Sequence, residues 1–413
     1  MRIASLTAAG RDVGKLCTSI ASQAKAFKPS ALLWVTDCSL NTEKIAECLS
    51  LSCAVSVGGV SRNGLIGAGS EFSGAGSRGD FRVCALAIGY DESVRCLPFS
   101  TRDDSLPSLP NDAWAKFAAA SPDTTPHLLL LASPPEMAAF PFEKLLSRLD
   151  TTLPWAKKVG GLTAGGDSRL WVGSQLQDGG CVGLALDGID MDVLVCQGAL
   201  PVSPSWQITA SEGNIIRGLD GQGVAAVLND ALEKVFAEQK SGNIMAGISV
   251  PTHPAIAAML GDANPTPIDA GAAREYVVRS ITGYSRQHSV LAVGASPDLL
   301  EAPGARLQLH WFSAENAKAE VTARATALAK QIASSGQAAS AGGMMVSCLG
   351  RGQGLFGEND VEPSILAETF GSPLELTGWF AGGEVGPVGA KTHVHTYTSA
   401  LALLRTRQRP DGV

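Results

Sequence analysis

One pattern occurs three times in the chain: an apolar, strand-like run is followed, after a helical stretch, by a second strand-like run that meets glycines. The first members are ALLWVTDCS, HLLLLASPP and GGMMVSCLGRG, at 31–39, 127–135 and 342–352. Their partners are CAVSVGGVSRNG, KVGGLTAGG and LTGWFAGGEVGPVG, at 53–64, 158–166 and 376–389. Another apolar run follows each pair, at 81–89, 179–188 and 393–404. This self-similarity restricts the chain to repeated α/β units.

The strand-like runs are apolar on both faces, which is typical of sheets covered on both sides, because a half-exposed strand alternates polar and apolar residues. We therefore predict an α/β fold: two domains of mixed β-sheet covered by helices, with internally repeated strand-helix-strand units. At 413 residues the chain exceeds what one core usually organises. The polar stretch EQKSGN places the boundary between domains at 1–240 and 241–413. We expect the domains to pack through their glycine-rich strand ends around a pocket.

Composition argues against several classes of partner. The net charge is −7 and no Lys/Arg-rich block occurs, so we expect no nucleic-acid binding. No apolar segment approaches the roughly 18–20 residues that span a bilayer, so we expect no membrane insertion. The nine cysteines are scattered, without CxxC pairs or Cys/His clusters. An unpatterned set of this kind is typical of a reducing compartment such as the cytoplasm.

The first thirty residues are rich in Ser and Ala and poor in acids, as organelle transit peptides are. Apolar residues nevertheless recur at helical spacing over 12–27, which predicts the first helix of a folded domain. A cytoplasmic location is the main expectation. The organelle stroma or matrix is the alternative if a leader is removed.

The segment SCLGRGQGLFG combines close-approach glycines with a cation. Gly352 and Gly354 allow backbone amides to approach a ligand, and Arg351 adds a planar fork that suits a carboxylate or phosphate. The segment therefore predicts an anion cradle; the alternative is a tight connection between core strands. Nucleotide binding is disfavoured, because acids at Glu358 and Asp360 stand where the dinucleotide fingerprint needs a helix to begin.

GGEVGPVG places Glu384 and Gly386 in a glycine-rich turn after the bulky Trp379. A carboxylate there can bind the ammonium group of a ligand, and with Arg351 it could clamp a zwitterion. The alternative is that Glu384 only ties the turn together. In the N-terminal half, Ser61, Asn63 and Thr163 follow the two VGG turns, where short polar side chains either bind a small ligand or bond their own backbone.

Cys348 is the best nucleophile candidate, because it precedes the same glycines and Arg351. A catalytic cysteine needs a base, and no His is near in sequence, so we assign no catalytic residue and favour a buried structural cysteine. His393 and His395 are two apart on an expected strand and share one face, as metal ligands would. With two ligands only, structural histidines are the preferred interpretation, and no metal or cofactor is expected.

Several segments resemble the FIST family, named for F-box and intracellular signal transduction. SVGGVSRNGLIGAGSEFS, KVGGLTAGG, GGCVGLALDG and ITASEGNIIRGLDG are similar to the FIST N-terminal domain. REYVVRSITGY, ARLQLHWFSAENA, VSCLGRGQGLFGENDVEPSIL and GWFAGGEVGPVG are similar to the C-terminal domain. The similarity runs from about 12 to about 400. It begins almost at Met1, so we expect no F-box of the kind that precedes these domains in eukaryotic members.

This resemblance implies an intracellular module for small-ligand sensing or binding in signal transduction, with amino acids as possible ligands. The protein is not expected to be an enzyme. One alternative is a protein-interaction or substrate-recognition module related to the F-box proteins of ubiquitin ligases, with a protein partner. The other alternative is a thiol-dependent enzyme that uses Cys348.

Overall fold

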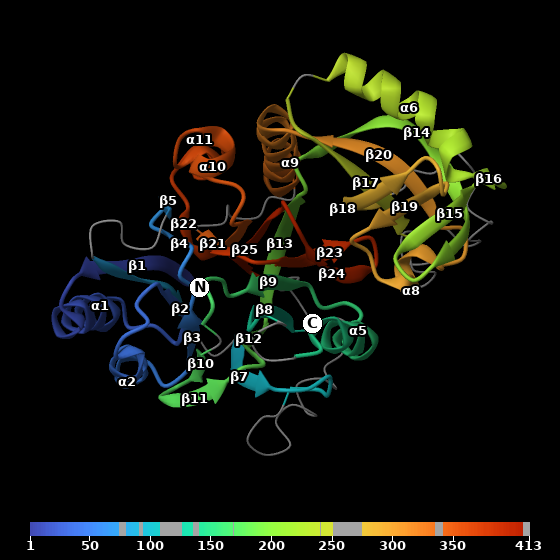
Figure 1. Cartoon of the computed structure of the whole chain (residues 1–413). Helices are drawn as coiled ribbons and strands as arrows, with labels where there is room; N and C mark the ends of the chain where they lie inside the picture. Colours follow the sequence, from blue (N-terminus) through green and yellow to red (C-terminus); the bar gives the residue numbers. More distant parts are fainter. Residues whose placement is uncertain are drawn as a thin grey trace. The chain divides into compact units, whose positions relative to one another are not determined.

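The computed structural model describes residues 1–73, 80–90, 94–107, 126–134, 140–167, 169–239, 241–250, 275–334 and 342–407. Strands and helices alternate in mixed sheets, which confirms the predicted α/β class (Figure 1). The chain forms two compact units. The first comprises 1–196, 321–387 and 392–413, and the second comprises 197–320 and 388–391. The predicted domain boundary at residue 240 is based on the sequence pattern and not on these compact units. It stays a prediction.

The first unit consists of three repeats with the same order of strands. The first repeat is β1 (Arg2–Gly10), α1 (Val13–Phe27), β2 (Ala31–Thr36), α2 (Thr42–Ser52), β3 (Ser56–Val60), β4 (Gly64–Gly67), β5 (Ser70–Ser73) and β6 (Phe81–Gly89). The second is β7 (Arg95–Thr101), β8 (His127–Ala132), α5 (Phe142–Thr152), β9 (Lys158–Leu162), β10 (Arg169–Val172), β11 (Gln175–Asp178) and β12 (Cys181–Asp187). The third is β13 (Ile189–Cys196), α9 (Ala314–Ser334), β21 (Gly342–Cys348), α10 (Gln353–Phe356), α11 (Val361–Phe370), β22 (Glu375–Ala381), β23 (Glu384–Val388), β24 (Lys391–His395) and β25 (Ser399–Thr406).

The repeated strand-helix-strand units of the sequence are these three repeats. β2 and β3, β8 and β9, and β21 and β22 are parallel pairs, as strands joined by a crossover helix must be. The apolar run that follows each pair, β6, β12 or β25, returns antiparallel to the first strand of its pair. The prediction of internal repeats is therefore confirmed.

The three sheets exchange strands in a ring. Their orders are β1-β6-β2-β3-β10-β11, β7-β12-β8-β9-β23-β24 and β13-β25-β21-β22-β4-β5. Each sheet is completed by a two-stranded extension from another repeat: the first repeat extends the third sheet, the second extends the first, and the third extends the second. The glycine-rich turns that follow β3, β9 and β22 therefore lead from one sheet to the next.

One glycine in each parallel pair has no room for a side chain. A Cβ at this glycine would lie 2.4, 1.9 or 1.6 Å from the carbonyl oxygen of the residue opposite, in the three repeats in order. The glycines and their opposite residues are Gly58 and Trp34, Gly160 and Leu130, and Gly378 and Met345. The backbones of each pair approach too closely for any other residue.

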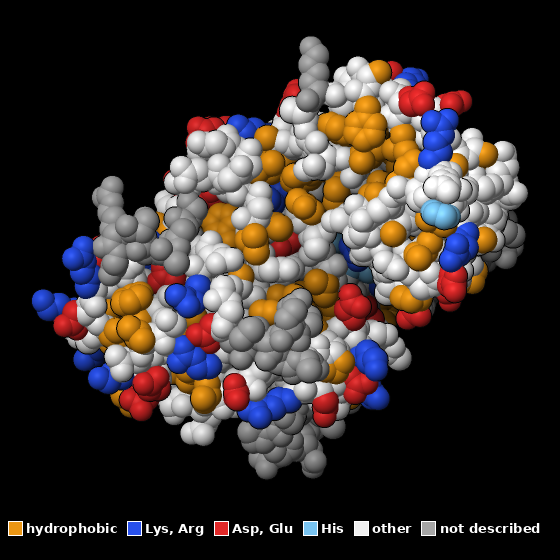
Figure 2. Space-filling model, in the orientation of Figure 1, with side chains coloured by type: hydrophobic (Ala, Val, Ile, Leu, Met, Phe, Trp, Pro, Cys, Tyr) orange, Lys and Arg blue, Asp and Glu red, His pale blue; other side chains and the backbone are white. Residues whose placement is uncertain are grey.

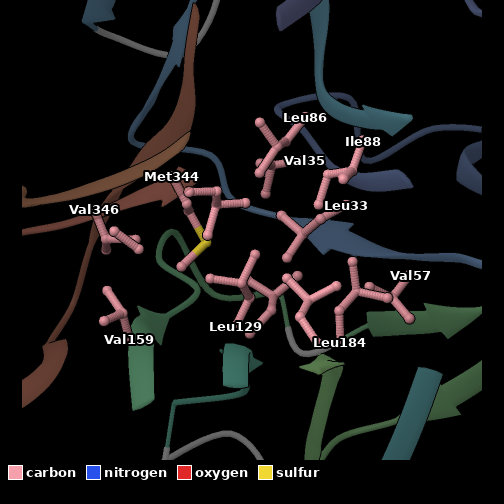
Figure 3. Packing of buried hydrophobic residues seen from close by; sticks show 14 of the residues in the cluster. Leu33, Val35, Val57, Leu86, Ile88, Leu129, Val159, Leu184, Met344 and Val346 are labelled. Atoms are coloured by element: carbon pink, nitrogen blue, oxygen red, sulfur yellow. The ribbon is translucent and has the colours of Figure 1, made fainter. Parts of the chain in front are cut away.

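The inner faces of the three sheets share one apolar core, part of which is shown in Figure 3. Helices cover the outer faces: α1 and α2 the first sheet, α5 the second, and α9 with α11 the third. Burial on both faces explains why the strand runs are continuously apolar. The labelled core residues from the three repeats are Leu33, Val35, Val57, Leu86, Ile88, Leu129, Val159, Leu184, Met344 and Val346.

The second unit interrupts the third repeat between β13 and α9. Its elements are β14 (Ala199–Glu212), β15 (Ile215–Leu219), β16 (Gln222–Gly223), α6 (Val224–Glu238), β17 (Asn243–Val250), β18 (Glu275–Ser285), β19 (Val290–Val293), α8 (Pro297–Leu300) and β20 (Arg306–Phe312). The strands pair antiparallel, and β14 contacts both β20 and β15, so the sheet closes on itself.

Candidate functional site

The turn after β21 carries the predicted anion cradle. β21 ends at Cys348, and the Arg351 N–H donates to the Cys348 carbonyl at 2.8 Å, which closes a tight turn. Gly352 follows with φ +55°, and a Cβ there would lie 2.8 Å from the Phe380 ring. Only glycine fits this position without strain. Gly354 lies on the exposed side of α10, in open space.

Arg351 points inward and is fully engaged in a buried ion pair. Its Nε donates to Glu362 Oε2 at 3.2 Å and its Nη2 to Glu362 Oε1 at 2.8 Å, while Nη1 donates to the Tyr397 carbonyl at 2.8 Å. The two side chains are 0% and 1% exposed. Ser347 Oγ donates to the same carboxylate at 3.1 Å. The guanidinium fork predicted for a ligand anion therefore holds the α11 carboxylate.

Glu362 is a site residue that the sequence interpretation missed. A buried arginine requires a carboxylate partner. The candidate acids in this crossover are Glu358, Asp360, Glu362 and Glu368, and only Glu362 is fully buried. Its position directly before Pro363, on the apolar side of a short helix, is the signal that could have identified it.

Glu384 lies fully buried at the start of β23. Its Oε2 accepts the Thr398 N–H at 3.1 Å, which ties the turn before β25. Its Oε1 accepts no hydrogen bond from any described residue. Burial raises the pKa of this carboxyl well above its usual range, although the Thr398 N–H, the positive charge of Arg351 and an interaction with the Cys348 thiol oppose the shift. The carboxyl is therefore a protonatable group whose Oε1 has only the weakly donating thiol beside it.

Cys348 is half-buried, and its thiol interacts with this carboxyl. Burial, and then the charge of Glu384, raise the pKa of its thiol to about 11. The next residues, Leu349 and Gly350, are exposed, with Leu349 at 51%. A thiol with a raised pKa is little ionised at neutral pH, which is the opposite of an activated nucleophile.

A second pair of acids, Glu71 of the first repeat and Asp360 of the third, lies near Arg351. The Glu71 N–H on β5 donates to the Asp360 carboxylate, and the Asp360 N–H donates to Glu71 Oε2 at 3.0 Å. Burial first, and then the charge of Glu362, raise the pKa of Glu71 to about 7. The site therefore collects Glu71, Glu362 and Glu384 around one arginine. Nothing in the GSEFS segment indicates this role, because the pairing of β4 with β22 creates it.

Free space beside Glu362 is small. A cavity of about 10 Å³ lies against Glu362, Met345 and Ser399. A cavity needs roughly 10–15 Å³ to hold one water. A wider groove of about 530 Å³ runs between α9 and α11, with Lys330 and Phe370 on its walls, and it contains none of the predicted site residues.

The predicted polar residues of the N-terminal half occupy turns near the same strand ends. Ser61 is buried, and its Oγ accepts the Ala164 N–H at 3.2 Å and donates to the Phe380 carbonyl at 3.5 Å. Ser61 therefore joins the second-strand ends of all three repeats. Thr163 Oγ1 donates to the Asp167 carbonyl at 3.1 Å, within its own turn. Asn63 is exposed.

Gly386 and the two histidines lie together on β23 and β24. The Gly386 carbonyl is 3.0 Å from His395 Nε2, and a Cβ on Gly386 would lie 2.6 Å from Val195. The His393 and His395 rings are 6.0 Å apart between centroids. Within the parts of the chain that the structure describes, no three His, Cys, Asp or Glu side chains are grouped to hold a metal.

Comparison with known proteins identifies both halves of the chain. The FIST N domain model matches residues 4–222, and the FIST C domain model matches residues 229–387. The chain belongs to the FIST family. The family assignment made from the glycine-rich motifs is therefore confirmed, and with it a place among signal-transduction domains.

This FIST protein is also similar to uncharacterized mycobacterial proteins. An uncharacterized protein of Mycobacterium bovis is 28% identical over 292 residues, covering 67% of each chain. An uncharacterized protein of Mycobacterium tuberculosis is 27% identical over 284 residues, again covering 67% of each. No helix in the described ranges is long and apolar enough to cross a bilayer. Acidic and basic side chains are interspersed on the face shown in Figure 2.

Proposed function

We propose that this FIST protein is a noncatalytic signalling module that binds a small molecule at Glu384, through an ammonium group or another hydrogen-bond donor. The observation that carries the proposal is Oε1 of the fully buried Glu384 carboxyl, which accepts no N–H or O–H hydrogen bond from the described residues and has the half-buried Cys348 thiol as its neighbour. A buried acceptor without a donor is costly, so a ligand that supplies the donor gains free energy there.

The surroundings of Glu384 favour an amine-bearing ligand over an anion. Arg351, the nearby cation, is neutralised by Glu362 through two hydrogen bonds, so it has little capacity to bind a second anion. A ligand ammonium would favour the charged form of Glu384 and would lower its raised pKa. Amino acids are therefore the first class to test.

We infer that access to Glu384 involves the exposed turn at Leu349 and Gly350. The Glu384 side chain is fully buried, so an amino acid reaches it only when a covering segment such as this turn moves. The turn has few buried apolar contacts, since Leu349 is exposed, and opening it leaves β21 and β22 paired. Ligand binding would thus be coupled to the conformation of the turn, which is what a sensor requires.

A thermal-shift screen tests this proposal. Free amino acids should raise the Tm of the wild-type protein, whereas the same molecules with an acetylated amine should not. Glu384→Gln keeps one acceptor oxygen but removes the negative charge that would pair with a ligand ammonium, and should weaken binding at least about tenfold, or about 1.4 kcal/mol. Asn63→Ala, which changes an exposed residue, is the matched control and should respond like wild type.

Two results would overturn the proposal: no amino acid or primary amine stabilises the wild-type protein, or Glu384→Gln responds as strongly as wild type. Circular dichroism of each variant establishes that it is folded before the comparison is made. The raised pKa of Cys348 argues against thiol-dependent catalysis. A role related to ubiquitin ligases, a protein partner and a cytoplasmic location stay predictions.

A further inference from the structure

Two cysteines outside the site face each other across a helix seam. α1 and α2 lie side by side on the outer face of the first sheet (Figure 1), where their apolar residues share one buried cluster. Cys17 is on α1 and Cys48 is on α2, and both side chains are half-buried at the edge of this cluster. Solvent therefore reaches the seam where they meet.

The hydrogen bonds of the two thiols are reciprocal. The Cys48 thiol donates to the Cys17 carbonyl at 3.1 Å, and the Cys17 thiol donates to the Lys44 carbonyl at 3.6 Å. In an α-helix the N–H of a residue points to the carbonyl four positions earlier, so the Lys44 carbonyl marks the turn next to Cys48. Each sulfur thus lies against the turn of the helix that carries the other cysteine.

The two sulfurs are also close enough to influence each other's ionisation, in opposite directions. A hydrogen bond with Cys17 is the main reason that the pKa of Cys48 is lowered, while the same contact raises the pKa of Cys17. In such a pair, the thiol with the lower pKa becomes the nucleophile and its neighbour retains the proton. Cys48 is therefore suited to react first and Cys17 to react second.

We propose that Cys17 and Cys48 form a reversible disulfide when the protein meets a hydroperoxide, so that this seam is an oxidation-sensitive modification site. The Cys48 thiolate attacks one peroxide oxygen, the O–O bond breaks, and the departing oxygen takes up a proton to leave as water or an alcohol. Cys48 is then a sulfenic acid. Cys17 sulfur attacks Cys48 sulfur, the S–O bond breaks, and the hydroxide leaves with the Cys17 proton as water.

The balance is two thiols and one hydroperoxide giving one disulfide, one water and one alcohol, or a second water from hydrogen peroxide. The product joins α1 to α2 covalently. A cross-link between elements far apart in the sequence restricts the unfolded chain, so the oxidised protein should unfold at a higher temperature. A small thiol reverses the step by exchange.

Cys38 provides a sharp control because it is a third thiol in the same repeat. It is fully buried and donates to the Leu40 carbonyl at 3.0 Å, so its sulfur is held in the loop before α2. Random oxidation would involve any cysteine that the oxidant reaches. If the structure favours one pair, the disulfide forms between Cys17 and Cys48, and Cys38→Ser leaves its rate of formation unchanged.

The test uses the reduced full chain and hydrogen peroxide at neutral pH, followed by peptide mass spectrometry without reduction. We expect a linked pair of peptides containing Cys17 and Cys48, lighter by two hydrogens than the separate peptides, and restored by dithiothreitol. Cys38→Ser should form the same link at the same rate. Cys17→Ser should stop at a Cys48 sulfenic acid that dimedone traps.

Three outcomes would overturn the proposal. The linked peptide is absent after peroxide has oxidised other cysteines; the link forms equally between Cys38 and either partner; or Cys17→Ser yields no trapped sulfenic acid at Cys48. A thermal-unfolding curve gives a second readout, because the oxidised wild type should melt above the reduced protein. Cys48→Ser, which cannot form the link, should show no such rise.

Discussion

The first and third repeats share one framework and differ in what connects its strands. In both repeats, a glycine in the second strand of the parallel pair lies directly against a carbonyl of the first strand. A third strand then pairs antiparallel with the first strand. The first crossover is the single helix α2, which buries small and aliphatic residues. The third is divided into α10 and α11 and encloses the Arg351–Glu362 pair. The parallel strand pairs therefore determine the fold, and the connections between their strands determine which repeat contains the charged site residues.

The largest expected effect tests the shared framework. Gly378→Ala places a Cβ 1.6 Å from the Met345 carbonyl oxygen, so the two strands must separate. We expect a loss of about 4 kcal/mol or more, or failure to fold, because the clash is with backbone. Gly58→Ala in the first repeat should behave similarly, since its Cβ meets the Trp34 ring at 2.2 Å and the Trp34 carbonyl at 2.4 Å. Denaturant unfolding measures both.

Gly354→Ala is the matched control for these variants. It lies in α10 with no atom within 4 Å of the added Cβ, and alanine favours helix over glycine by about 1 kcal/mol. Its stability should equal or slightly exceed that of wild type. If Gly378→Ala were as stable as Gly354→Ala, close backbone approach would not be the reason for the glycine in each repeat.

The next effect concerns the buried Arg351–Glu362 ion pair, which distinguishes the third repeat from the first. Arg351→Met leaves Glu362 buried without its cation, which costs about 3–5 kcal/mol. Adding Glu362→Met should recover most of the loss, because two apolar side chains leave no charge in the core. In the first repeat, Arg11→Met removes the exposed pair with Asp80, and should cost under about 1 kcal/mol.

Thermal or denaturant unfolding of the four proteins tests this contrast. A double variant no more stable than Arg351→Met would mean that Arg351 is needed for more than neutralising Glu362, for example for its bond to the Tyr397 carbonyl. An Arg11→Met loss as large as that of Arg351→Met would remove the distinction between the two repeats.

The framework could be predicted from the sequence and the site only in part. Apolar runs and glycines recur in order along the chain, so the strand pairs are visible without coordinates. The way in which two-stranded extensions of one repeat join the sheet of another is not visible in the sequence, because β4 and β5 are four residues each and have no strong pattern. Glu71 reaches Asp360 only through that exchange. The bounds of the second unit cannot be recognised from the sequence either, because strands and helices follow one another there as they do in the first unit.

The smallest effect tests the exchange itself through pH. The pKa of Glu71 is raised from 4.5 to about 7 in the folded protein, mainly by burial. The folded state therefore holds a proton that the unfolded state releases between about pH 4.5 and 7, and stability falls as pH rises through this window. The shift corresponds to about 3 kcal/mol at most. Glu71→Gln removes the titration, so its stability relative to wild type should rise across this window and level off above it.

Glu71→Ala separates this charge effect from the hydrogen bond. The glutamine carbonyl can still accept the Asp360 N–H, whereas alanine leaves that donor unsatisfied. Glu71→Ala should therefore follow the pH curve of Glu71→Gln and lie about 1 kcal/mol below it. A Glu71→Gln curve parallel to that of wild type would show that Glu71 is not held in this buried environment. The insertion of β5 from the first repeat into the third sheet, on which the acid cluster depends, would then be incorrect.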